Sequence, residues 1–109
     1  MNYIEASQEF IKIVKNYNGT LDYKEDKVRF YSDNIITGYY TNGEIWKQNK
    51  VRCEISIQEI DNRILLNGHE DSYEIIGGFA TSYSKEELIN KLDIFNFSKK
   101  NYQYSLFDL

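Results

Sequence analysis

The chain has few of the residues that build disulfide scaffolds, zinc sites or membrane spans. Among its 109 residues there are one cysteine, one histidine and no proline. The single cysteine, Cys53, cannot form an internal disulfide, and with one histidine it cannot complete a common zinc site. The longest uninterrupted aliphatic run, Ile64 to Leu66, is far shorter than the ~20 residues of a membrane span. We therefore expect no metal, no cofactor and no membrane association.

The chain also has no excess of basic residues. Thirteen lysines and arginines stand against seventeen acidic residues, which gives a net charge of -4 and a pI near 5.0. Such a chain has no electrostatic means of gripping the DNA backbone, so nonspecific DNA binding is not expected. The first residues do not resemble a secretory leader, because Glu5, Glu9 and Lys12 interrupt the apolar positions. These features predict a single cytoplasmic domain.

The sequence holds no motif typical of catalysis. His69-Glu70-Asp71 is the one cluster with metal-ligand chemistry, and we interpret it as a solvated acidic loop after Asn67-Gly68. Cys53 falls on the apolar side of an alternating segment, which is typical of a buried, inert thiol. Gly77-Gly78 lacks the following lysine of a phosphate-binding loop. We expect no enzymatic activity and no catalytic residues.

Two helices are predicted, one near each end of the chain. Between Tyr3 and Tyr17 the apolar residues recur every three or four positions, which predicts an amphipathic helix that begins at Asn2 and Glu5 and ends at Asn18-Gly19. A second helix should begin at Ser84, where the Ser84 hydroxyl and Glu87 can form a capping box. Its inward-facing residues should be Leu88, Ile89 and Leu92.

The segment between the helices has the two-residue period of strands. Val51 to Ile57 alternates apolar and polar residues, as a strand does when one face lies on a core. Chain reversals are predicted at Lys24 to Asp26, Asn42-Gly43, Asp61-Asn62 and Asn67-Gly68. Connections this short favour antiparallel pairing.

The expected fold is therefore α+β: an antiparallel β-meander of about five or six short strands, flanked by an N-terminal and a C-terminal helix, over residues 1–97. The predicted core comprises Phe10, Ile13, Val14, Val28, Phe30, Ile55, Ile57, Leu88 and Leu92. Residues 98–109 are predicted to form a C-terminal tail.

The tail contains the sharpest motif, Gln103-Tyr104-Ser105-Leu106-Phe107. It resembles the motif that binds the bacterial sliding clamp (DNA polymerase III beta): Gln, usually Leu, then Ser or Asp, then Leu, then Phe. Four positions match, and Tyr104 replaces the usual leucine. The resemblance implies that the glutamine amide hydrogen-bonds at a cleft of the clamp while Leu106 and Phe107 fill an apolar pocket. Alternatively, the apolar tail residues form a last strand that joins the core.

A second candidate surface is acidic. The segment from Glu54 to Glu74 carries six carboxylates against Arg63, and on one face they could occupy the basic groove of a nucleic-acid enzyme. A solvated sheet face with acidic turns is the alternative. The acidic candidates are Glu54, Glu59, Asp61, Glu70, Asp71 and Glu74. Aromatic residues of the strands could add partner anchors or could pack within the fold; these are Tyr31, Tyr39, Tyr40, Trp46 and Tyr73.

Two functional hypotheses follow. The first is a small non-enzymatic protein that binds the sliding clamp through its tail and recruits or blocks a DNA-replication or repair partner. The second is a phage-type inhibitor of a host defence nuclease, similar in style to anti-CRISPR or anti-restriction proteins, which acts through the acidic and aromatic sheet face. In size, acidity and residue usage the chain is similar to small accessory proteins of phages, which act in the cytoplasm of a bacterial host.

Overall fold

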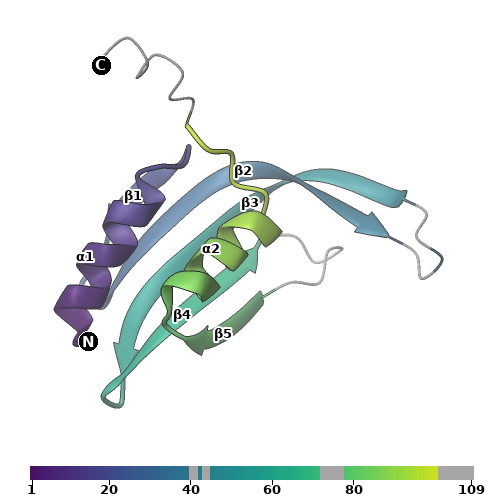
Figure 1. Cartoon of the computed structure of the whole chain (residues 1–109). Helices are drawn as coiled ribbons and strands as arrows, with labels where there is room; N and C mark the ends of the chain where they lie inside the picture. Colours follow the sequence, from purple (N-terminus) through teal and green to yellow (C-terminus); the bar gives the residue numbers. More distant parts are fainter. Residues whose placement is uncertain (40–41, 43–44, 72–77, 101–109) are drawn as a thin grey trace, which may run out of the picture.

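Two helices lie on one face of a five-stranded antiparallel sheet (Figure 1). The computed structural model describes residues 1–39, 42, 45–71 and 78–100. The elements, in chain order, are α1 (Tyr3–Val14), β1 (Thr20–Tyr23), β2 (Lys27–Tyr39), β3 (Ile45–Ile60), β4 (Arg63–Glu70), β5 (Gly78–Ser82) and α2 (Lys85–Ile94). The strand order β1-β2-β3-β4-β5 follows the chain, so the predicted α+β fold with a β-meander is confirmed.

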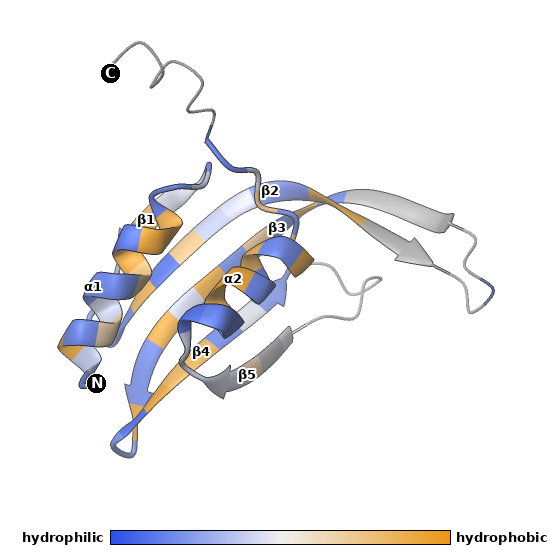
Figure 2. Ribbon diagram, viewed as in Figure 1, coloured by the Kyte–Doolittle hydropathy of each residue, from blue (hydrophilic) through white to orange (hydrophobic). Residues whose placement is uncertain are grey.

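The strands differ from the prediction in length. β2 and β3 are single strands of 13 and 16 residues rather than a series of short ones, and they pair from Lys27 opposite Gln58 to Tyr39 opposite Ile45. The reversal predicted at Asn42-Gly43 falls between those last partners, although Gly43 itself lies outside the described residues. Every second residue along a strand faces the helices. Figure 2 shows hydrophobic and hydrophilic residues following one another along β3 and β4.

The prediction of a reversal at Asn67-Gly68 is wrong, because both residues lie within β4. Gly68 faces α2, where an added Cβ would lie 2.6 Å from Cε2 of the Phe95 ring. The glycine therefore permits close packing of a ring rather than a turn. The reversal at Asp61-Asn62 is confirmed, since both residues have positive φ between β3 and β4.

The first helix begins as predicted and ends earlier than predicted. Asn2 and Glu5 form the capping box, but the last helical residue is Val14 and Lys15 caps the end. Gly19 does not end the helix. It lies against Phe30, and an added Cβ would be 2.4 Å from the ring atom Cζ.

The core lies between the helices and the sheet. Of the predicted core residues, Ile13 and Val28 are partly buried and the others are buried. Ile89, predicted to face inward, is 41% exposed, so that prediction is wrong. At the start of α2, Ser84 Oγ accepts a hydrogen bond from the Glu87 backbone N–H at 3.1 Å. Phe95 and Phe97 complete the core after α2, and Phe97 stacks on Phe30 with ring centroids 5.2 Å apart.

Candidate interaction surfaces

The structure separates the residues of the His69-Glu70-Asp71 cluster. His69 and Glu70 are adjacent residues of β4, so their side chains lie on opposite faces of the sheet, and the predicted loop is wrong. His69 is exposed, whereas Glu70 is 8% exposed on the helix-covered face. Within the described residues, no three His, Cys, Asp or Glu side chains gather where they could hold a metal ion.

Cys53 lies on the helix-covered face of β3 and is fully buried, as predicted. Burial raises the pKa of the Cys53 thiol to about 11, and the nearby Glu70 carboxyl adds to the shift. The thiol is therefore protonated at neutral pH. A buried, protonated thiol is a poor nucleophile.

The acidic residues singled out in the sequence do not share one face. Glu54 lies opposite His69 on the uncovered face of the sheet, and Glu70 lies opposite Cys53 on the covered face. Glu59 has the same strand parity as Cys53 but is exposed near the end of β3. Asp61 lies in the β3–β4 turn. Asp71 follows β4 and donates its backbone N–H to the Arg52 carbonyl, while Glu74 lies outside the described residues.

The uncovered sheet face carries charges of both signs rather than an acidic field. Arg29 contacts Asp22 at 2.6 Å and Glu54 at 2.9 Å. Arg52 contacts Asp33 at 2.6 Å. The hydrogen bonds from these arginines hold the pKa of the Asp22 and Asp33 carboxyls below the usual value. Salt-bridged carboxylates project less negative potential than free ones.

An aromatic ring joins the two ion-paired groups. The guanidinium carbons of Arg29 and Arg52 lie 5.0 and 4.9 Å from the centre of the Tyr31 ring. Both distances are typical of cation–π contacts. Tyr31 is thus packed between the two arginines on the uncovered face of the sheet. The side chains of the other sheet aromatics singled out in the sequence lie outside the described residues.

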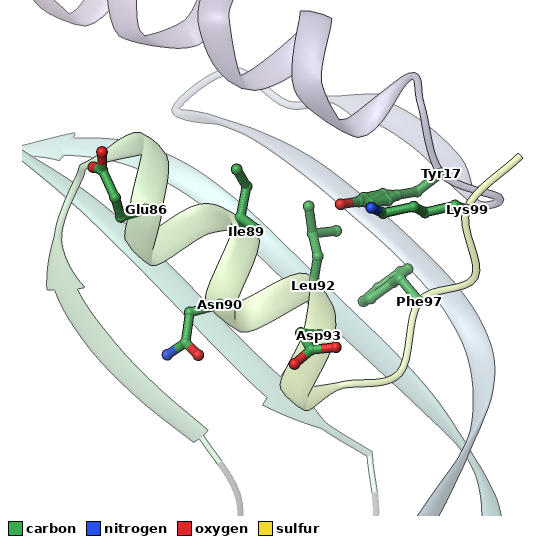
Figure 3. Close-up of a pocket in the computed structure, with 8 residues that line it drawn as sticks. All are labelled: Tyr17, Glu86, Ile89, Asn90, Leu92, Asp93, Phe97 and Lys99. Atoms are coloured by element: carbon green, nitrogen blue, oxygen red, sulfur yellow. The ribbon is translucent and has the colours of Figure 1, made fainter.

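A groove runs between α1 and α2 on the covered side of the sheet. It consists of two adjoining pockets of about 420 and 540 Å³ that share Tyr17, Ile89 and Lys99. Figure 3 shows Tyr17 alongside Lys99, with Ile89 and Leu92 projecting toward them from α2. This groove could not be predicted from the sequence, because its walls come from residues 9–17 and residues 85–100, which lie far apart along the chain.

Residues 98–100 leave the core along the end of α1. The backbone N–H of Asn18 donates to the Ser98 carbonyl at 2.8 Å, and that of Lys100 donates to the Asn16 carbonyl at 2.9 Å. Tyr17 and Lys99 form an antiparallel bridge. The first three residues assigned to the tail are therefore attached to the domain. Gln103, Tyr104, Ser105, Leu106 and Phe107 lie outside the described residues.

Comparison with protein-family models, with curated proteins and with solved structures found no match. Among the described residues, no helix is long and apolar enough to cross a membrane.

Proposed function

We propose that the protein is a non-enzymatic interaction protein that binds a bacterial sliding clamp through Gln103, Ser105, Leu106 and Phe107, with Tyr104 at the second motif position. The observation that carries this proposal is the route of the chain out of the core. Phe97 is buried, whereas Ser98, Lys99 and Lys100 are exposed, so the backbone reaches the surface just before the motif begins. A peptide ligand needs such an exit in order to reach its receptor.

The direction of the chain at this exit supports a ligand over a terminal strand. Residues 98–100 run antiparallel to residues 16–18, so each further residue is directed from Asn18 toward Asn16. That direction leads toward α1 and away from β1, which begins at Thr20. Continuing the same ladder would not extend the sheet at β1. Among the described residues, the last buried apolar side chain along the chain is that of Phe97.

The energetics of the motif are adequate for a transient partner. Burial of Leu106 and Phe107 in an apolar pocket would contribute roughly 1.5–3 kcal/mol each, and an ordered Gln103 amide would add about 1 kcal/mol. Contacts of Tyr104, Ser105 and the flanking residues must supply the remaining ~1–4 kcal/mol and must also offset the cost of ordering the segment. We expect micromolar affinity, which corresponds to about 8 kcal/mol.

Calorimetric titration of the full chain into a bacterial sliding clamp tests the proposal. We expect micromolar binding, which a Phe107→Ala variant reduces at least tenfold because its apolar anchor is lost. A Tyr102→Ala variant is the matched control, since it removes an aromatic side chain just outside the motif. No heat of binding for the wild-type chain, or equal losses in the two variants, would contradict the proposal.

The nuclease-inhibitor hypothesis receives less support. It requires the acidic residues to present one negative face, but Glu54 and Glu70 occupy opposite faces and Glu54 is ion-paired with Arg29. The two hypotheses also predict different results for a chain that lacks residues 103–109. Removal of residues 103–109 should abolish clamp binding, whereas an inhibitor that acts through the sheet should remain active.

A further inference from the structure

The groove between the helices has an apolar floor that the described part of the chain leaves open. Ile89 is the most exposed of its apolar side chains at 41%, whereas Tyr17 and Leu92, which line the same pocket, are buried. Exposed isoleucines scattered singly are ordinary on a protein surface. Here the side chain lies in a concave site formed by two adjoining pockets, which is the shape expected of a binding site.

The larger pocket of the groove is lined by more basic than acidic side chains, whereas the smaller pocket adds the acidic Glu86 and Asp93. The larger pocket is lined by Lys12, Lys85, Lys99 and Lys100, with Glu9 as its one acidic residue. The whole chain has a net charge of -4. Charge complementarity therefore favours an occupant that combines apolar side chains with a carboxylate.

Residues 101–109 have this composition and begin at the groove. This segment follows directly on Lys100, which lines the larger pocket. Three of its last four residues are apolar, namely Leu106, Phe107 and Leu109, and Asp108 is its charged side chain. The segment contains no lysine or arginine. The described chain ends in the ladder between residues 98–100 and 16–18, which runs from Asn18 toward Asn16 and the end of α1.

The length of the segment is also sufficient. Nine extended residues span about 30 Å, whereas the 12 residues of α1 are about 18 Å long. A short tether keeps the segment at millimolar effective concentration near the groove. Weak contacts are then enough to populate a docked state.

We propose that residues 101–109 dock in the groove between α1 and α2, with their apolar side chains against Ile89 and Tyr17 and with Asp108 near the lysines of the larger pocket. One consequence rests on the proposed function: the docked state covers Leu106 and Phe107, so a clamp must compete with the groove for the same side chains. The apparent affinity for the clamp then falls in proportion to the undocked fraction.

Paramagnetic broadening in the full chain tests the docking without any clamp. A nitroxide is attached to a Ser105→Cys variant, in which buried Cys53 should not react because its thiol is inaccessible and protonated. The methyl signals of Ile13 and Ile89 report on the groove. The methyl signal of Ile60, which is exposed at the end of β3, is the control.

We expect at least fivefold stronger broadening at Ile13 and Ile89 than at Ile60, and relief of the Ile13 broadening when Ile89→Asp is added. Equal broadening at all three methyl groups would overturn the proposal. So would broadening that appears only between labelled and isotope-enriched copies, which would assign the groove to a second copy of the chain.

The clamp experiment separates this inference from the proposed function. If both are correct, Ile89→Asp in the otherwise unchanged chain should bind the clamp severalfold more tightly than the wild type. Methyl broadening at the groove with no clamp binding would overturn the proposed function alone. Clamp binding with no broadening at the groove would overturn the docking alone.

Discussion

At the scale of single residues, two glycines determine where aromatic rings can pack. Gly19 leaves room for the ring of Phe30, and Gly68 leaves room for the ring of Phe95. From the sequence, Gly19 is predicted at a helix end and Gly68 in a turn, because a glycine beside an asparagine is typical of both. Glycine is required both where there is no room for a side chain and where the backbone has a positive φ, so the sequence alone does not show which of the two applies. Only the packing of distant rings distinguishes the two roles.

The Gly19→Ala variant should therefore be less stable than the wild type. The added Cβ would lie 2.4 Å from Cζ of Phe30, so the ring must move out of its stack with Phe97. We expect a loss of about 1–3 kcal/mol, as for other overpacked cores, measured by urea unfolding. Glu25→Ala in the exposed β1–β2 turn is the control and should stay within about 0.5 kcal/mol. Equal stability of the two variants would show that the ring is not confined.

The buried Glu70 carboxyl should make part of the stability depend on pH. Burial raises the pKa of Glu70, and its Oε2 atom has no hydrogen-bond partner among the described residues. The pKa of Glu70 is therefore higher in the folded protein than in the unfolded chain. Its contribution to the free energy of unfolding is fully present below the unfolded-state pKa and is lost as the pH rises through the folded-state pKa. Glu70→Gln should therefore raise the urea midpoint at pH 7.

The difference between Glu70→Gln and the wild type should shrink as the pH falls below the unfolded pKa of glutamate, near 4.3. Exposed Glu59 lies on the neighbouring strand, and Glu59→Gln serves as the matched control. A midpoint at pH 7 that is lower in Glu70→Gln than in the wild type would show that the carboxylate is stabilised in the fold by contacts that the amide cannot make.

At the scale of elements, periodicity and caps predicted the helices and the meander, but not all boundaries. The capping box of Asn2 and Glu5 was predictable, because its chemistry is local. The full length of β2 and β3 was not, since a strand continues wherever its neighbour offers hydrogen-bond partners. The exposure of Ile89 was also unpredictable, because it depends on how far apart α1 and α2 lie on the sheet (Figure 1).

Two adjacent residues of α2 test which side of the helix is buried. Leu88 is fully buried, whereas Ile89 lines the open groove. We expect Leu88→Ala to cost about 2–5 kcal/mol of unfolding free energy and Ile89→Ala to cost less than about 1 kcal/mol, as judged by thermal or urea unfolding. Comparable losses would place Ile89 in the core and would show that it does not line an open groove.

At the scale of the whole molecule, the sequence contains the motif on which the proposed clamp binding rests, and the structure shows a groove between the helices. The motif was detectable because its five residues are contiguous. The groove was not, because Tyr17, Ile89 and Lys99 come together only after α1 and α2 pack on the sheet. The opposite faces of Glu54 and Glu70 could not be predicted for a related reason, since they depend on how β3 and β4 are paired.

If the segment from Gln103 to Phe107 binds the sliding clamp, as we propose, completing its motif should increase the affinity. Tyr104→Leu restores the residue usual at the second motif position while leaving the described domain unchanged. We expect this variant to bind a bacterial sliding clamp roughly fivefold more tightly than the wild type, for a gain of about 1 kcal/mol, in a calorimetric titration. Unchanged or weaker binding, or no binding by either protein, would contradict the claim.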